Sequence, residues 1–284
     1  MLRCKELISI AIPDTSLEDC HDLRTKTEKL FYIGRAMAIF KVDNCLIYRT
    51  THMDKNVHKK EVRRMKTILE YLACPQYLRK AIFPLKRDLE YAGILSPLAT
   101  PSHKPSKAKV RQGEIREGLI FLGSGNIPLA EVGLKHPIKL LKPPKMSITT
   151  PIRTYLRMYY QNNRFVGEVV PFEEAKREMY LGFQVKVTDA LLSRTLKGKK
   201  NDLKIVCSRD GRKYTSKDVE MIQKSQNKVF IFGSPKIGVP GILKSEGSNV
   251  SEVSDICLNF IPSTGTRTVR LEEAIMITLA RTQS

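Results

Sequence analysis

Short strand-like segments crowd the middle of the chain, and this crowding most restricts the folds that the chain can adopt. The segments lie at 115–122, 128–134, 137–141, 147–160 and 164–170, separated by glycines, prolines and an Asn-Asn pair. Strands at this density, without long helices between them, predict a small β-barrel of about the size of an OB-like module. The proline- and serine-rich stretch before them, 96–110, is typical of a linker.

Strands and helices alternate on both sides of this β-rich segment. Before it, apolar runs and helical spacing predict strands at 7–13 and 45–49 and helices at 23–40 and 58–74. After it, they predict strands at 183–187, 203–208, 228–234 and 255–262 and helices at 215–225 and 270–282. The sequence therefore predicts an α/β domain that begins before the barrel and finishes after it. We expect its N-terminal part at 1–103, the barrel at 104–180 and its C-terminal part at 181–284.

Capping signals refine two of these helices. Thr15 and Glu18 have the spacing of a capping box, although the helical pattern that follows strengthens only from Asp22. Thr215 and Asp218 form a second candidate cap, directly before the helix at 215–225.

The charge balance favours a polyanionic partner. The 284 residues include 49 Lys and Arg against 29 Asp and Glu, a formal net charge of +20. Nucleic acid is the first partner to consider, before an anionic membrane. The alternative is that the lysine excess is solvated surface that serves solubility.

Cysteine usage and hydropathy indicate the compartment. The six cysteines are scattered without a C-x-x-C pair, which favours a reducing, cytoplasmic setting without disulfides. No apolar run approaches the roughly 18 residues needed to span a membrane, so we expect no membrane segment. The start of the chain lacks the features of a signal peptide.

Several familiar sites fail on inspection of their motifs. Gly233 and Gly238 have the spacing of a phosphate-binding loop, but Val239 and Pro240 stand where Lys and Ser or Thr are required. The stretch 123–128 misses the last glycine of the dinucleotide fingerprint. The five histidines are isolated and show no metal-ligand spacing, so we expect no metal site.

Three strand-to-loop transitions in the last third remain as candidates. They are SRDGRKY at 208–214, FGSPKIGVPG at 232–241 and IPSTGTRTVRLEEA at 261–274. Ligands of open α/β sheets bind beyond the carboxyl ends of strands, where loops expose backbone amides. Each loop alone is typical of an ordinary turn, whereas three in succession indicate a small-molecule pocket.

At this point the sequence resembles a known family, the SPOUT or trefoil-knot methyltransferases. The resemblance is to the archaeal and eukaryotic branch of RNA methyltransferases with an OB-like insertion. It is carried by CPQYLRKAIFPLKRDLEYAGILSPL at 74–98 and STGTRTVRLEEAIMITLA at 263–280. Further support comes from LRT at 23–25, GRAMAIFKVD at 34–43 and IREG at 115–118.

The resemblance implies a deep C-terminal trefoil knot, a homodimer and S-adenosyl-L-methionine as cofactor. The lysine-rich, tryptophan-free composition, together with this compact form of the family's architecture, indicates an archaeal source. The loops at 208–211, 232–238 and 261–270 would hold that cofactor, whose sulfonium carries the electrophile. The implied cofactor-binding residues are Ser208, Arg209, Gly211, Phe232, Gly233, Ser234, Gly238, Asn259, Ile261, Pro262, Thr264, Gly265, Thr266, Thr268, Val269 and Glu273.

Three arginines are candidates for a catalytic role. Arg267 would hold a target phosphate or the cofactor carboxylate, and the family places basic residues such as Arg24 and Arg35 near the methyl donor. The alternative for Arg24 and Arg35 is an ordinary helix-surface position. No residue stands out as a general base, so the methyl acceptor stays open.

Basic and aromatic residues interleave in and before the β-rich segment, a pattern typical of proteins that bind single-stranded nucleic acid. The candidate RNA-binding residues are Lys107, Lys109, Arg111, Arg153, Tyr155, Arg157, Tyr159 and Arg164. The alternative is that the tyrosines fill the barrel interior. The predicted function is S-adenosylmethionine-dependent methylation of rRNA or tRNA. Two alternatives are a non-catalytic RNA-binding or assembly protein and another α/β nucleotide-binding enzyme.

Overall fold

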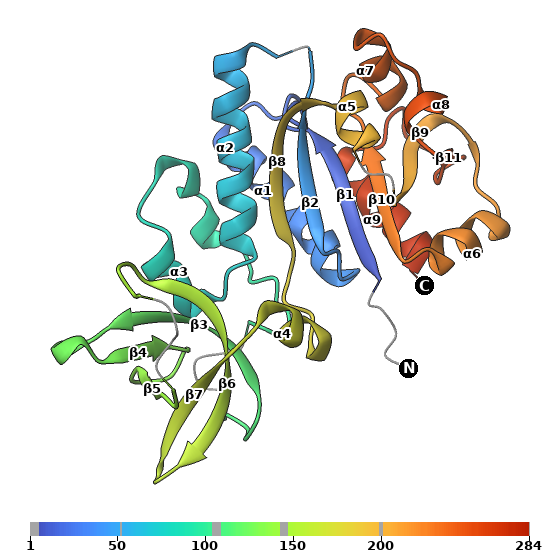
Figure 1. The fold of residues 1–284 in the computed structure, drawn as a ribbon. Helices are drawn as coiled ribbons and strands as arrows, with labels where there is room; N and C mark the ends of the chain where they lie inside the picture. The colour runs from blue at the N-terminus through green and yellow to red at the C-terminus, as the bar shows by residue number, and fades with distance from the viewer. Residues whose placement is uncertain (1–5, 52, 104–108, 143–146, 199–200, 284) are drawn as a thin grey trace. The chain divides into compact units, whose positions relative to one another are not determined.

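The computed structural model describes residues 6–51, 53–103, 109–142, 147–198 and 201–283 (Figure 1). The chain forms two compact units. The first comprises Met1–Ala73, Arg87–Leu95 and Phe183–Ser284, and the second comprises Cys74–Lys86 and Ser96–Gly182. The second unit is therefore inserted into the first, and the short segment Arg87–Leu95 returns to the first unit in between.

The first unit is built on a six-stranded sheet with the order β11-β9-β10-β1-β2-β8. All neighbouring strands are parallel. The strands are β1 (Leu7–Pro13), β2 (Asn44–Arg49), β8 (Gln184–Leu191), β9 (Leu203–Lys213), β10 (Asn227–Phe232) and β11 (Ile256–Asn259). This arrangement confirms the predicted α/β class, while the trefoil knot stays a prediction.

Helices cover both faces of this sheet. They are α1 (Leu23–Ile39), α2 (Lys55–Leu72), α5 (Leu192–Lys197), α6 (Ser216–Lys224), α7 (Val239–Ser245), α8 (Val250–Val253) and α9 (Leu271–Gln283), with 3-10 turns at Arg87–Leu89 and Ala92–Ile94. Figure 1 shows α1 and α9 behind the sheet. No described helix is long and apolar enough to cross a membrane.

The central strands read as continuous apolar runs because side chains on both of their faces are buried. In β1, Ala11 packs in a cluster with Leu192 of α5 and Ile242 of α7, while its neighbours Ile10 and Ile12 are equally buried on the opposite face. Alternate residues of a strand point to opposite faces, so one apolar run contributes side chains to the packed layers on both faces of the sheet.

Helix α1 begins at a different cap from the one that Thr15 and Glu18 indicate. Asp22 is the N-cap: its carboxylate accepts the Thr25 backbone N–H at 2.7 Å, and the Thr25 hydroxyl closes the reciprocal bond. Thr15 lies instead in a buried turn directly after β1. The capping-box spacing at Thr15 is therefore a wrong signal, because the chain must first leave the sheet before a helix can start.

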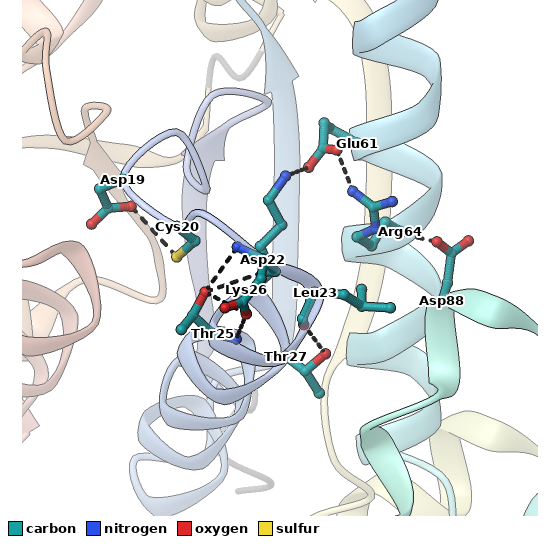
Figure 2. A network of polar contacts seen from close by, with 10 residues as sticks. All are labelled: Asp19, Cys20, Asp22, Leu23, Thr25, Lys26, Thr27, Glu61, Arg64 and Asp88. Atoms are coloured by element: carbon teal, nitrogen blue, oxygen red, sulfur yellow. Dashed lines mark hydrogen bonds and ion pairs between the residues drawn. The ribbon is translucent and has the colours of Figure 1, made fainter.

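A polar network joins α1, α2 and the returning segment of the first unit (Figure 2). Glu61 of α2 contacts Lys26 of α1 at 2.9 Å and also pairs with Arg64. Arg64 in turn contacts Asp88 of the 3-10 turn at 3.2 Å. The segment Arg87–Leu95 lies in the sequence between the two parts of the second unit, and this network ties it to α1 and α2 of the first unit.

The second unit contains a closed barrel with the order β3-β4-β5-β7-β6. Its strands are β3 (Ile115–Leu122), β4 (Pro128–Glu131), β5 (Ile138–Leu140), β6 (Ile152–Gln161) and β7 (Arg164–Val170), accompanied by α3 (Gln76–Ile82), α4 (Phe172–Glu178) and a 3-10 turn at Ser124–Asn126. Ile120, Leu156 and Met158 are among the residues that fill its interior. The closed barrel confirms the prediction of a small β-barrel within the chain.

Candidate functional site

The carboxyl ends of the parallel strands lie at one edge of the sheet, and the three candidate segments belong to neighbouring strands there. Because β11, β9 and β10 are adjacent, the segments that follow β10 and β11 and the last part of β9 meet at this edge. Such an edge is the usual ligand site of open α/β sheets.

The loop after β10 is a compact turn that only glycine permits at its first position. Ser234 donates its backbone N–H to the Ile237 carbonyl at 2.9 Å, and the Ser234 hydroxyl oxygen accepts the Ile237 N–H at 2.9 Å. A Cβ on Gly233 would lie 2.8 Å from backbone atoms of Ile237, Gly238 and Val239. The turn then leads into α7, for which Gly238 is the N-cap.

The first candidate loop is part of a strand rather than a free loop. Strand β9 continues to Lys213, and its pairing with β11 jumps from Val206 to Arg212, so residues 207–211 form an irregular bulge of five residues. A Cβ on Gly211 would lie 2.8–2.9 Å from backbone atoms of Cys257 and Leu258. The close approach of β11 therefore decides the conformation of this segment, and no local pattern signals it.

Asn259, the last residue of β11, joins the bulge to the third loop. Its amide nitrogen donates to the Arg209 carbonyl at 3.0 Å, and its side-chain oxygen accepts the Ile261 backbone N–H at 2.9 Å. One side chain therefore fixes two of the three predicted cofactor-binding segments relative to each other.

The third loop is exposed and braced by its own threonines. Thr264 donates its hydroxyl to the Thr266 carbonyl at 2.9 Å, and Thr266 donates to the Thr268 carbonyl at 3.0 Å. Ile261 and Val269 are partly buried, while Pro262 is exposed. The loop thus offers backbone groups and an apolar border on an open edge of the sheet.

Two further predicted cofactor-binding residues are Gly265 of this loop and Glu273 of α9, and their roles toward the cofactor stay predictions. A Cβ on Gly265 would meet no atom of the described structure within 4 Å, so the chain itself has room for a side chain there. Glu273 accepts the Arg270 backbone N–H at 2.9 Å and therefore caps the start of α9.

The catalytic candidates lie on two elements. Arg24 is largely exposed on α1 and pairs with Glu28 at 3.1 Å, one helical turn away. Arg35 is partly buried on α1, and Arg267 is exposed on the third loop. Their catalytic roles stay predictions.

Tyr48 contributes to this edge although its sequence context gave no signal. Its buried hydroxyl donates to the Phe232 carbonyl at 2.7 Å, at the point where β10 becomes its loop. Burial, together with the nearby carboxylates of Asp14 and Glu246, raises the pKa of Tyr48 well above its usual range. The hydroxyl therefore stays protonated and fixes the start of the loop.

A buried acid-histidine pair lies beside Tyr48 and was also missed. The Asp14 carboxylate accepts the Thr50 hydroxyl at 2.8 Å and lies 2.7 Å from Nδ1 of His58. These residues come from three separate segments, so the isolated position of His58 in the sequence hid its partner. Among the described residues, no group of three His, Cys, Asp or Glu side chains could hold a metal ion.

Of the predicted RNA-binding residues, those in the outward-facing row of β6 are engaged within the barrel unit. Arg153 pairs with Glu117, and Arg157 contacts Glu174 at 2.9 Å as well as Glu178. Tyr155 packs against Phe172, and burial raises its pKa. Tyr159 donates to Glu168 at 3.4 Å.

The remaining candidates of this group are exposed or lie outside the described part of the chain. Lys109, Arg111 and Arg164 are exposed. Lys107 lies outside the described residues. The barrel therefore has two kinds of basic residue, those paired with carboxylates along β6 and those open to solvent.

The fold defines an α/β protein with a ligand edge and an inserted barrel, and comparison with known proteins gives its family. A family model described as "Putative RNA methyltransferase" matches residues 7–282. The chain belongs to this family of RNA methyltransferases, which confirms the membership that the sequence motifs predict.

Several known proteins are similar over nearly the whole chain. A human protein named 28S rRNA (uridine-N(3))-methyltransferase is 28% identical, over 97% of this chain and 77% of that protein. The Drosophila melanogaster protein of the same name is 28% identical over 97% of this chain and 61% of that protein. A Halobacterium salinarum protein is 29% identical over 95% of this chain and 96% of that protein.

One solved structure is distantly similar. The SpoU methyltransferase AviRb from Streptomyces viridochromogenes, solved in complex with the cofactor AdoMet, has a TM-score of 0.36 and 6% identity. The similarity covers 98% of this chain and 58% of that one. A likeness of this size supports no inference about the site.

Proposed function

We propose that this protein transfers a methyl group from S-adenosylmethionine to RNA at the carboxyl edge of its sheet. The observation that carries the proposal is the link through Asn259, which holds the β9 bulge and the loop after β11 together beside the turn after β10. Membership in an RNA methyltransferase family supplies the reaction class.

The groups at this edge fit such a cofactor. The segments 208–211, 232–238 and 259–269 supply backbone N–H and carbonyl groups for an adenine edge, and partly buried Ile261 and Val269 supply apolar contact. Threonine hydroxyl oxygens at 264, 266 and 268 accept further hydrogen bonds. When bound, the cofactor supplies an activated methyl group, so the transfer requires neither a metal nor a covalent bond between the protein and its substrate.

The residues of this chain would then align the RNA rather than react with it. Arg267 lies on the exposed third loop, where a guanidinium can hold a phosphate bidentately. Arg24 and Arg35 of α1 are proposed to hold the target nucleotide. Because relatives in human and fly are named rRNA (uridine-N(3))-methyltransferases, we propose N3 of a uridine in rRNA as the acceptor. The N3 proton would pass to solvent as the methyl group is transferred, and S-adenosylhomocysteine would be released. The barrel is proposed to collect that RNA.

Calorimetry with S-adenosylmethionine and mass spectrometry of nucleosides from methylated rRNA test the proposal together. We expect saturable cofactor binding and 3-methyluridine that appears only with both protein and cofactor. RNA binding without any cofactor binding would instead favour the non-catalytic RNA-binding alternative.

Gly233→Ala tests where the cofactor binds. The added Cβ would lie 2.8 Å from three backbone positions of the same turn, so the turn must open. We expect the affinity for S-adenosylmethionine to fall at least about tenfold, a change of about 1.4 kcal/mol. RNA affinity and the far-ultraviolet circular dichroism spectrum should not change.

Gly93→Ala is the matched control, because a Cβ there meets no atom of the described structure within 4 Å. It should bind the cofactor like the original protein. Normal cofactor binding by Gly233→Ala would show that the cofactor does not bind at the turn after β10.

We also propose that the protein is a homodimer. Light scattering at micromolar concentration should give about twice the chain mass of 32.3 kDa. A single species at the monomer mass would contradict this proposal.

A further inference from the structure

An aromatic pair lies on the hairpin between β6 and β7, next to its turn. Tyr160 and Phe165 face each other across the two strands, with ring centroids 5.0 Å apart. Phe165 packs against the barrel core, whereas Tyr160 is 51% exposed. One ring is therefore anchored and supports a second ring that faces solvent.

The strand pattern explains why this pair is uncovered. Tyr160 has the same parity along β6 as Leu156 and Met158, which are buried in the barrel. Alternate residues of a strand share a face, so Tyr160 continues the interior row beyond the barrel end. With respect to the described residues, Tyr160 at this end therefore stays half exposed.

The hairpin holds this platform in one geometry. Asn162 and Asn163 both have positive φ values, 47° and 65°, as the two-residue turn of a tight hairpin requires. The Tyr160 hydroxyl donates to the Asn163 side-chain oxygen at 2.8 Å, and the Tyr160 backbone N–H donates to the Gln112 side chain at 2.8 Å. The ring is thus oriented without any ligand.

Three exposed basic residues lie next to the pair in the chain or on the segment 109–112, whose Gln112 contacts Tyr160. Arg164 precedes Phe165, and Lys109 and Arg111 flank Val110, which packs against the same core cluster as Phe165. Among the described residues, none of these three cations takes part in an ion pair. The nearby carboxylate of Glu114 is occupied by the Arg116 guanidinium and the Arg111 backbone N–H.

We propose that this tip, made of Tyr160, Phe165, Lys109, Arg111 and Arg164, binds unpaired nucleotides of single-stranded RNA. A base stacks on the exposed Tyr160 ring, and the cations hold the phosphates on either side. A duplex keeps its bases stacked inside the helix and cannot offer one to the ring. The inference rests on the proposed function only in taking RNA as the substrate.

The test measures binding of fluorescein-labelled oligouridine of 12 nucleotides and of a 12-base-pair RNA duplex by fluorescence anisotropy, using the whole protein. We expect the protein to prefer the single strand. Tyr160→Leu, which keeps apolar bulk but removes the ring, should weaken single-strand binding about tenfold. Tyr160→Phe keeps the ring and should bind within about twofold of the original.

Charge reversal tests the phosphate contacts. Arg164→Glu should weaken single-strand binding by at least about tenfold and flatten its salt dependence, because a counterion-releasing contact is lost. Arg177→Glu, an equally exposed site on α4 with the same change of charge, is the control and should have a smaller effect.

Each possible result has a defined meaning. Equal affinity of Tyr160→Leu and the original protein, or equal binding of duplex and single strand, overturns the inference. Calorimetry of the same variants with S-adenosylmethionine keeps the two proposals separate, because the tip variants should bind the cofactor normally. Absence of cofactor binding in the original protein would overturn the proposed function while leaving the tip intact.

Discussion

Asn259 holds two segments with the two ends of one side chain. Its N–H group donates to Arg209 in the β9 bulge, and its oxygen accepts from Ile261 in the third loop. Because asparagine is both donor and acceptor, neither aspartate nor leucine can replace both bonds. The relative position of the β9 bulge and the third loop in the proposed cofactor site therefore depends on a single side-chain amide.

Asn259→Asp tests this dependence. The carboxylate can still accept the Ile261 N–H, but it places a second acceptor 3.0 Å from the Arg209 carbonyl. The loss of a hydrogen bond and the new repulsion should cost about 1–2 kcal/mol, and so weaken S-adenosylmethionine binding about tenfold. Calorimetry measures the change. Asn201→Asp, at an exposed turn, is the control and should leave the affinity for S-adenosylmethionine unchanged. Normal cofactor binding by Asn259→Asp would contradict the role assigned to the amide.

At the scale of elements, α6 shows a cap that the sequence predicts fully. Thr215 is the N-cap, and its hydroxyl and backbone N–H both donate to the Asp218 carboxylate at 2.8 Å. Arg212 adds bonds to the same carboxylate at 2.6 and 2.7 Å. These donors, Arg212 foremost, hold the pKa of Asp218 well below its usual value near 3.8.

Asp218→Asn should destabilise the protein in a pH-dependent way. A lowered native pKa contributes stability that is fully present above the usual value near 3.8 and is lost as the pH falls towards the native value. At pH 7 we expect a loss of about 1 kcal/mol in the free energy of unfolding, typical of a helix cap. Urea unfolding between pH 2 and pH 7 should show the difference from the original protein shrinking in acid.

Glu220→Gln on the same helix is the control, because Glu220 is exposed and only weakly paired with Lys224. It should change stability by less than about 0.5 kcal/mol at any pH. A pH-independent loss in Asp218→Asn would show that packing, rather than charge, explains the effect.

Strand β6 carries two different surfaces, which its sequence pattern does not separate. Its outward row pairs Arg153 and Arg157 with glutamates, whereas the inward row fills the barrel and ends in the exposed Tyr160. In the sequence, the interleaved basic and aromatic residues indicate nucleic-acid binding without distinguishing one row from the other. Only the carboxylates supplied by β3 and α4 distinguish the two rows.

At the scale of the whole molecule, the chain leaves the α/β unit, returns briefly at Arg87–Leu95 and leaves again. The returning segment is secured by Asp88, which contacts Arg64, and through it by Glu61 and Lys26 (Figure 2). Side chains of Glu61, Lys26 and Arg64 are at most 19% exposed, so little water replaces a lost partner.

Glu61→Gln should therefore destabilise the α/β unit clearly. Removing one carboxylate leaves the partly buried Lys26 without its partner and leaves Arg64 with Asp88 alone, and we expect a loss of about 2 kcal/mol, below the 3–5 kcal/mol of fully buried pairs. Glu28→Gln, at the exposed pair with Arg24, should cost less than about 0.5 kcal/mol. Thermal and urea unfolding measure the loss of stability in both variants. Equal small losses would contradict the stabilising role of the polar network.

The sequence alone determined the strands and the longer helices, their α/β and barrel groupings, and the family, whereas the short helices α4, α5, α7 and α8 were not predicted. The predicted features follow from local patterns: apolar runs for β1 and β10, helical spacing for α2, close-set strands for the barrel, and a cap at Thr215. Each pattern reflects burial of a face or a backbone preference, and both act over a few residues.

Tertiary structure alone decided which polar groups of distant segments meet. The bulge at Gly211 exists because the β11 backbone approaches it, and Tyr48 reaches Phe232 across 184 positions of sequence. Likewise, Arg153 is neutralised by Glu117 while Arg164 is left open on the hairpin tip. A residue's type states what it can bind, but its partner is set by strand order and register, which bring together segments that no local pattern relates.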